Sequence, residues 1–182
     1  MNKQRQPVLG LDIGRVIINA ADSSGQADTS FLSGSDEAAL STPASPGALE
    51  AIHELVAAFD GRVWLVSKCG PRIQQLTKRW LRRQRFHELT GVRQDRVLFC
   101  LKRPQKRDHC LAIGATHFVD DRLDVLQHLV GLVPHLYWFG FQPGDGSAPA
   151  WARRALDWGE TRQAILSQLA EPSSGSELAR GA

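Results

Sequence analysis

The stretch "VLGLDIGRVII", residues 8–18, places one acidic side chain inside a run of apolar residues. Its Val, Leu and Ile content is typical of a buried strand, which we expect over 7–13 with a continuation at 16–18. An ionised side chain in such surroundings needs a partner, because moving an isolated charge from water into an apolar interior is very costly. Asp12 is therefore a candidate functional residue, and Gly14 predicts a sharp turn directly after it.

Four further apolar stretches have the same character, and amphipathic patterns separate them. The expected strands are 62–67, 96–101, 116–120 and 135–140. The expected helices are about 47–60, a helix from Pro71, 105–113, 122–130, 149–157 and 160–170. Strands that alternate with helices predict a parallel sheet covered on both faces. We therefore expect an α/β fold, a three-layer α/β/α sandwich with a Rossmann-like parallel sheet of about five strands.

The 182 residues fit a single domain, which we expect to span 1–170. Two segments lie outside the alternating pattern. Residues 20–46 are rich in Ser, Ala, Gly, Asp and Pro, which predicts a flexible flap, and residues 171–182 are expected to form a disordered tail. The flap is too short to form a second domain.

The composition excludes several classes of protein. Hydrophobic residues make up 42% and charged residues 23%, which is ordinary for a globular chain. No apolar stretch approaches the roughly 18–20 residues that span a membrane, and we recognise no signal peptide. The three cysteines form no C-x-x-C pair, so they are expected to be free thiols. This favours a cytoplasmic protein without a structural zinc site.

Basic residues are clustered, although the formal net charge is only +3. The clusters are "KRWLRRQR" at 78–85 and "LKRPQKRDH" at 101–109. Such clusters favour anionic partners such as phosphates, and the first one could contact nucleic acid. The alternative is that they form a solvated helix face and a solvated loop.

Polar residues follow the expected strands at the point where each strand ends. They are Asp12 after the first strand, Ser67 after the second, Lys102 and Lys106 after the third, and Asp120 and Asp121 after the fourth. The carboxyl ends of parallel strands meet at one edge of the sheet, where ligands of open α/β sheets bind. We therefore expect these side chains to gather at a single site.

The carboxylates of this predicted site repel one another and require a cation. Oxygen-only ligands suit Mg²⁺, which usually takes one or two carboxylates together with phosphate oxygens of a substrate. Asp12 is expected to serve as nucleophile and metal ligand, and the turn at Gly14 lets its carbonyl approach the ion. The serine hydroxyl and the lysine ammonium group would hold the remaining oxygens of a phosphate dianion.

In this order the motifs resemble those of the haloacid dehalogenase superfamily, whose commonest members are Mg²⁺-dependent phosphatases. The resemblance covers about residues 7–140 and rests on "LDIGRVI", "WLVS", a lysine before the last motif, and "FVDDRLD". It implies that Asp12 attacks phosphorus and forms an aspartyl-phosphate that is later hydrolysed. The same resemblance makes a phosphorylated compound the expected substrate.

The resemblance also implies the binding roles. Ser67 and the backbone amide of Lys68 would hold a phosphoryl oxygen. Lys106 would neutralise charge that builds up in the transition state, and Lys102 is the alternative for this role. We favour Lys106 because it is expected at the start of a helix that faces the site.

Mg²⁺ is the cofactor that the resemblance implies. Its ligands would be Asp12, the carbonyl of Gly14 and Asp121, with Asp120 and Asp124 as direct ligands or as support for them. No sizeable cap domain is expected, because the flap and one helix fill the interval between the first two motifs. An open site of this kind admits large substrates, including nucleic-acid ends.

One departure from the family pattern affects the chemistry. The usual first motif is D-x-D, and Gly14 stands where its second Asp acts as general acid and base; Arg15 and Val16 also replace the usual Gly and Thr. Loss of a general acid costs roughly 10²–10⁴ in rate. Three explanations are open: a leaving group that needs no acid, such as an acyl or anomeric phosphate; a substitute acid, with Asp22, His117 or the substrate itself as candidates; or slow turnover.

The sequence therefore predicts a Mg²⁺-dependent phosphohydrolase that works through Asp12. The first alternative is a weak or inactive phosphate-binding module of the same fold, and the second is a nucleic-acid end-processing or binding protein. The sequence leaves the substrate and the oligomeric state open.

Overall fold

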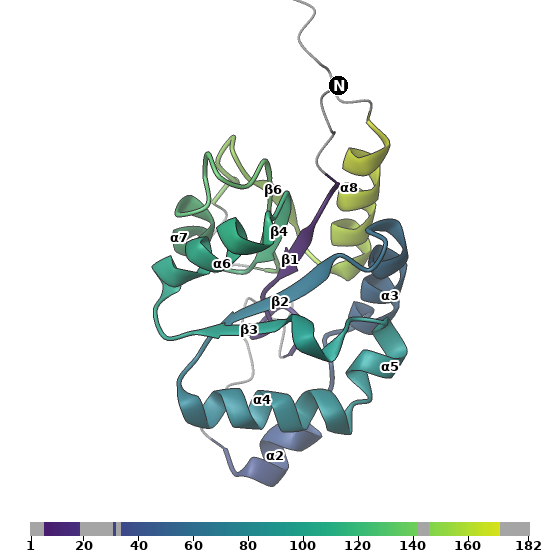
Figure 1. The fold of residues 1–182 in the computed structure, drawn as a ribbon, viewed down its shortest axis with the longest axis vertical. Helices are drawn as coiled ribbons and strands as arrows, with labels where there is room; N and C mark the ends of the chain where they lie inside the picture. Colours follow the sequence, from purple (N-terminus) through teal and green to yellow (C-terminus); the bar gives the residue numbers. More distant parts are fainter. Residues whose placement is uncertain (1–5, 19–30, 32–33, 142–145, 172–182) are drawn as a thin grey trace, which may run out of the picture.

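Six parallel strands form one sheet in the computed structural model of the chain, in the order β3-β2-β1-β4-β5-β6 (Figure 1). The structure describes residues 6–18, 31, 34–141 and 146–171. The strands are β1 (Leu9–Leu11), β2 (Val63–Lys68), β3 (Val97–Cys100), β4 (His117–Asp120), β5 (His135–Phe139) and β6 (Arg153–Ala155). The helices are α2 (Asp36–Ser41), α3 (Ala48–Ala58), α4 (Pro71–Arg83), α5 (Phe86–Thr90), α6 (Lys106–Ile113), α7 (Leu123–Gln127) and α8 (Trp158–Ala170).

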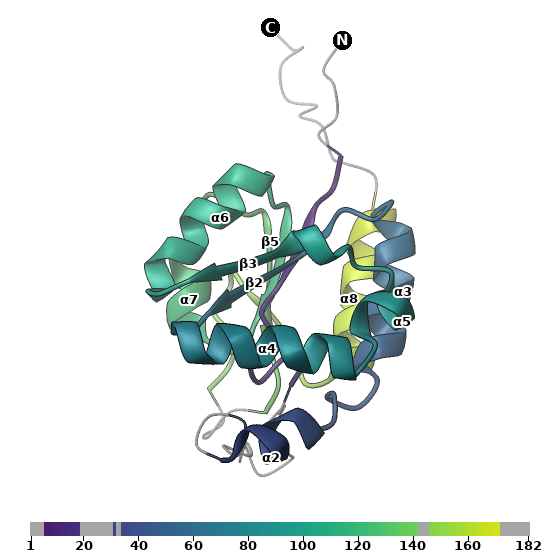
Figure 2. The same cartoon turned by 60° about the horizontal axis from the view of Figure 1, so that its bottom comes forward.

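The helices cover the sheet on both faces, as the alternating pattern predicts. Helices α6 and α7 lie on one side, and α3, α5 and α8 lie on the other (Figure 2). Each face has its own apolar core, and the residues of α4 join the core that contains α3 and α8. The α/β/α class is therefore confirmed, with one strand more than the expected five.

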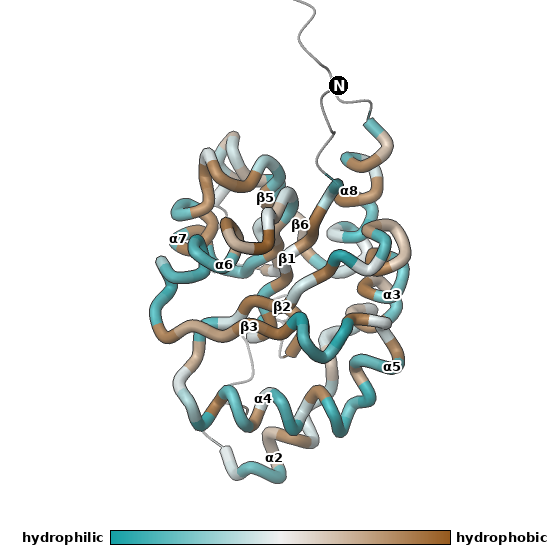
Figure 3. The backbone as a smooth tube through the Cα atoms, viewed as in Figure 1, coloured by the Kyte–Doolittle hydropathy of each residue, from teal (hydrophilic) through white to brown (hydrophobic). Residues whose placement is uncertain are grey.

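Side chains of one strand serve both cores, because successive residues of a strand point to opposite faces. In β5, Leu136 and Trp138 pack with the core beneath α6 and α7, whereas Tyr137 and Phe139 pack with the other core. The interiors of β2, β4 and β5 accordingly have apolar residues at successive positions, while α4 alternates between hydrophilic and hydrophobic segments (Figure 3). This is why the strands look apolar throughout in the sequence.

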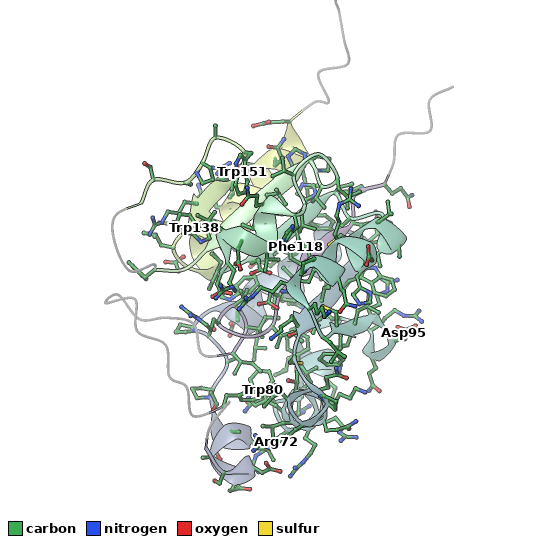
Figure 4. All side chains as sticks on the ribbon, turned by 90° about the vertical axis from the view of Figure 1, so that its left-hand side faces the viewer. Arg72, Trp80, Asp95, Phe118, Trp138 and Trp151 are labelled. Atoms are coloured by element: carbon green, nitrogen blue, oxygen red, sulfur yellow. The ribbon has the colours of Figure 1, made fainter. Side chains whose placement is uncertain are left out.

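Gly10 in β1 permits a close approach between β1 and its neighbour β4. A Cβ atom at this position would lie 2.4 Å from Cδ2 of Phe118, whose ring covers the glycine. Phe118 is fully buried near the centre of the molecule (Figure 4). The glycine therefore sets the position of β4 beside β1, and with it the position of the acidic residues that end β4.

Two local predictions are wrong. Residues 16–18 are no strand: Val16 and Ile17 lie in a turn, and Ile18 makes isolated bridges to Gly14 and Ala44. The region expected as a helix at 149–157 contains β6, because pairing with the edge of β5 outweighs helical propensity there. Trp151 is consequently a half-exposed residue in a turn, while Trp158 starts α8 and is buried.

The expected flap is partly helical. Helix α2 lies within it, and Ser35 caps the helix by accepting a hydrogen bond from the Ala38 amide. Residues 19–30 and 32–33 of the flap, and residues 172–182 of the expected tail, lie outside the described residues. Within the described ranges, no helix has both the length and the apolar character needed to cross a membrane.

Candidate active site

Four chain segments meet at the carboxyl edge of the sheet around one open cavity of about 380 Å³. The end of β1 is tied to β4, because the Asp12 amide donates to the Val119 carbonyl at 2.9 Å. The cavity is lined by Asp12, Gly14, Arg15, Ser67, Lys68, Cys69, Gly70, Ile73, Arg103, Lys106, Asp121, Arg122 and Val125. The side chains that the strand-end argument brings together therefore lie around this cavity, except for Lys102 and Asp120.

Three aspartates form a compact acidic cluster at this edge. Asp12, Asp120 and Asp121 are all buried, and each offers a carboxylate oxygen within 4.8 Å of the oxygens of the others. Such an all-oxygen donor set is the kind that a hard divalent cation such as Mg²⁺ prefers. The residues present therefore fit the predicted metal.

Lys106 lies inside this cluster and binds two of its members. Its Nζ atom is 2.7 Å from Oδ1 of Asp12 and 2.7 Å from Oδ2 of Asp120. Burial alone would lower the pKa of this lysine, but the two carboxylate charges outweigh burial and raise it. Lys106 is therefore a cation held between two acids, whereas Lys102 is exposed in the preceding turn.

Asp120 is directed toward protein partners rather than the cavity. One of its oxygens binds Lys106, and the other accepts a hydrogen bond from the Arg122 amide at 3.0 Å. Burial raises the pKa of its carboxyl, and the ammonium group of Lys106 opposes this rise. With both oxygens engaged, Asp120 is placed to fix Lys106.

Asp121 faces the cavity and carries a second cation. Nε of Arg15 is 3.1 Å from Oδ2 of Asp121. Burial and the charge of Asp12 raise the pKa of Asp121 to about 6, and Arg15 acts in the opposite direction. Sequence reasoning identified Arg15 only as a departure from the family pattern, and nothing in the sequence indicates that its side chain reaches Asp121.

The turn after Asp12 differs from the expectation. The left-handed residue is Arg15, with φ of 63°, and Gly14 itself has no positive φ. A Cβ atom built on Gly14 would meet no atom within 4 Å. The glycine is therefore not required by the turn or by packing.

The end of β2 supplies neutral and basic groups to the cavity. Ser67 is buried and Lys68 exposed, and Gly70 precedes the first residue of α4. Cys69 also lines the cavity, but burial raises the pKa of its thiol to about 11, so it is no nucleophile near neutral pH. Cys69, Cys100 and Cys110 are all buried free cysteines.

Two arginines, Arg103 and Arg122, form the outer rim of the cavity. Sequence reasoning included Arg103 only within the basic cluster 101–109 and did not single out Arg122. Nε of Arg122 is 2.9 Å from Oδ1 of Asp124, and Nη1 of Arg103 is 3.6 Å from Oδ2 of the same residue. Asp124 is half-exposed and is not part of the cavity wall, so it holds the rim arginines instead of supporting the acidic cluster. Their position directly before α6 and after the acidic doublet is the signal that could have indicated them.

The two proposed substitute acids do not lie in the described site. His117 is the first residue of β4, so it lies at the opposite edge of the sheet from the cavity. Asp22 lies outside the described residues.

The comparisons with known proteins support the fold. No protein-family model and no curated protein matches the sequence. A haloacid dehalogenase-like family hydrolase from Xanthomonas campestris matches with a TM-score of 0.58 and 13% identity, over 90% of this chain and 96% of that chain. A haloacid dehalogenase-like hydrolase from Burkholderia xenovorans LB400 matches with a TM-score of 0.57 and 16% identity, over 90% and 98%. The chain therefore has the fold of haloacid dehalogenase-like hydrolases.

Proposed function

We propose that this protein is a Mg²⁺-dependent phosphohydrolase that acts through an aspartyl-phosphate on Asp12. The observation that carries the proposal is the convergence of Asp12, Ser67, Lys106 and Asp121, which come from four separate segments, on one open cavity. Metal ligands, a cation and a hydroxyl together form the set that phosphoryl transfer requires.

Each residue has a distinct part in the proposed reaction. Asp12 attacks phosphorus in line with the leaving oxygen, and Lys106 holds the attacking carboxylate in place. Ser67 donates to a phosphoryl oxygen beside the amino end of α4, where helix amides also favour an anion. Asp12 and Asp121, with the Gly14 carbonyl, would hold Mg²⁺, which offsets the charge of the phosphoryl oxygens when bound.

Substitution of the nucleophile tests the proposal. Wild type and Asp12→Asn are compared on para-nitrophenyl phosphate with and without Mg²⁺, and we expect activity only in wild type with metal. Asp95→Asn is the matched control, because Asp95 is exposed and lies outside the cavity. Metal-dependent turnover that survives unchanged in Asp12→Asn would contradict the mechanism.

A phosphate-binding module without turnover is the second candidate function. Two observations favour it. Gly14 has no acidic side chain, and Arg15 forms an ion pair with Asp121, a predicted metal ligand. Calorimetric binding of Mg²⁺ and inorganic phosphate, without turnover of any ester in a broad panel, is the result that this candidate predicts.

A nucleic-acid role has less support from the described residues. On α4, Arg79 lies 2.7 Å and Arg72 3.3 Å from carboxylate oxygens of Asp36, and Arg83 lies 3.0 Å from Glu37. Figure 2 shows α2 directly beside α4, and Figure 4 shows Arg72 of α4 next to α2. Part of the basic face of α4 is thus already neutralised within the chain.

A further inference from the structure

The described cavity wall offers no group suited to protonate a leaving oxygen. Its carboxylates are Asp12 and Asp121, which the proposed function uses as nucleophile and metal ligands. The other titratable groups of the described wall are the Cys69 thiol, whose pKa burial raises to about 11, and the lysine and arginine cations, of which Lys106 is already held between Asp12 and Asp120. Neither histidine nor tyrosine is among the described residues that line the cavity.

Packing does not impose this lack of an acid. Gly14, the position at which the family resemblance implies the acid, is exposed, its φ is not positive, and a Cβ there meets nothing within 4 Å. An aspartate at residue 14 would therefore fit without strain. A site that has room for an acid but contains none is consistent with a reaction that does not need one.

Cations dominate the same wall. The described lining residues with positive charge are Arg15, Lys68, Arg103, Lys106 and Arg122, against the carboxylates of Asp12 and Asp121. The two cations nearest the acidic cluster pair with it, and Asp124 offsets only one of the two rim arginines. The described wall of the cavity, including the two arginines of its rim, therefore keeps an excess of positive charge.

We infer that the natural substrate, on the proposed function, carries its phosphoryl group on an oxygen that leaves as a stable anion, as in an acyl phosphate or a phosphoanhydride. Asp12 forms the new bond to phosphorus, and the bond to the leaving oxygen breaks. That oxygen keeps the electron pair and departs as a carboxylate or phosphate among the rim cations. No proton is needed in this step, so an acid at residue 14 would contribute little.

The second half of the reaction has a different requirement. Water attacks the phosphorus of the aspartyl-phosphate, one of its protons passes to solvent, and the bond to Asp12 breaks to release inorganic phosphate and restore the carboxylate. Without a general base at residue 14 this step is slowed. The aspartyl-phosphate therefore accumulates, and a burst of leaving group precedes steady turnover.

A series of leaving groups in two proteins tests the inference. Wild type and Gly14→Asp are assayed on acetyl phosphate, pyrophosphate, para-nitrophenyl phosphate and ethyl phosphate. We expect Gly14→Asp to raise kcat/KM for ethyl phosphate by roughly 10²–10⁴ and to leave acetyl phosphate nearly unchanged. The ratio of kcat/KM between the two proteins is taken for each substrate, so differences in intrinsic reactivity among the substrates cancel. Gly146→Asp is the matched control, because it adds the same charge at an exposed glycine with open space around it.

The phosphorylated protein gives a readout that is independent of turnover. Rapid quenching of wild type with acetyl phosphate should trap close to one acid-stable phosphate per chain, and Gly14→Asp should trap much less. The rates with acetyl phosphate and pyrophosphate then separate an acyl phosphate from a phosphoanhydride as the preferred substrate.

The rim is tested by Arg103→Gln, with Arg107→Gln as the control. Arg107 is exposed on the same helix region and does not line the cavity. We expect Arg103→Gln to lower kcat/KM for the preferred anionic substrate about tenfold, less than the loss of a buried oxyanion donor. An unchanged value would overturn the assignment of the rim to the leaving group.

Three results overturn the inference while the proposed function stands. They are hydrolysis of ethyl phosphate by wild type as fast as acetyl phosphate, an equal gain on both esters in Gly14→Asp, and an Asp22→Asn defect confined to ethyl phosphate. The last result would identify an acid outside the described residues. Absence of turnover on the whole series, acetyl phosphate included, overturns the proposed function and this inference with it.

Discussion

Both edges of the sheet bury titratable side chains, but these side chains are charged at the carboxyl edge and neutral at the amino edge. At the carboxyl edge, Lys106 is held between Asp12 and Asp120 as a charged group. At the amino edge, the ring of His117 lies 4.5 Å from that of His135 and 5.1 Å from that of Phe59, centroid to centroid. Charges persist only where opposite charges meet them, so the carboxyl edge is suited to ionic chemistry and the amino edge to packing.

The tautomer of His117 follows from its neighbours. The Thr116 hydroxyl donates to the Val8 carbonyl at 3.1 Å, so it accepts from Nδ1 of His117 at 2.8 Å. Nε2 then carries a lone pair, and it is buried without a hydrogen-bond partner among the described residues. Protonation would place a charge there that nothing offsets, and burial lowers the pKa of His117 to about 3.

Substitution of Lys106 should have the largest effect on stability of the changes considered at the two edges. Lys106→Met leaves Asp12 and Asp120 as buried carboxylates without their cation, which is expected to cost about 3–5 kcal/mol of unfolding free energy. Denaturant unfolding without metal measures this loss. Lys102→Met, at an exposed position, should change stability by no more than about 0.5 kcal/mol. A similar loss in both variants would show that the buried pair has no special weight.

Acid should destabilise the amino edge first. The folded-state pKa of His117 lies near 3 and the unfolded value near 6.5. Between these pH values His117 binds a proton in the unfolded chain but not in the folded chain. Stability from this residue is complete above pH 6.5 and falls by about 1.4 kcal/mol per pH unit below it, which gives about 2 kcal/mol at pH 5.

The pH dependence of two variants isolates this effect. Stability of His117→Phe relative to wild type should rise as pH falls from 7 to 5, whereas His128→Phe, at an exposed histidine, should follow wild type. Parallel curves for wild type and His117→Phe would exclude the residue as the source of acid sensitivity.

Substitution of Arg15 at the carboxyl edge should have a smaller effect, on the affinity for Mg²⁺. Its guanidinium competes with a metal for Asp121, and its side chain is 41% exposed, so the pair is partly screened. We expect Arg15→Gln to bind Mg²⁺ about threefold to tenfold more tightly in calorimetry without phosphate, equivalent to about 1 kcal/mol. Arg107→Gln is the control, and weaker binding by Arg15→Gln would mean that Arg15 orders the site instead of competing for it.

Local sequence patterns sufficed where one element is stabilised by its own periodicity. The strands around Leu65, Phe118 and Leu136 have continuously apolar interiors, and α4 has Pro71 at its first position. Patterns failed where a partner decides the outcome. Residues 153–155 are a strand only because β5 offers an unpaired edge, and α2 forms where it packs on α4.

The sequence by itself determined that this chain alternates strands with helices and that acidic, hydroxyl and basic residues follow the strand ends. These are local properties, because apolar periodicity and the ends of strands depend on residues that are consecutive in the chain. Only the tertiary structure decided that Lys106 binds Asp12 and Asp120, that Arg15 reaches Asp121 and that Asp124 holds the rim arginines. Those contacts depend on strand order, since β1 lies between β2 and β4 and so brings residues distant in the chain within a few ångströms.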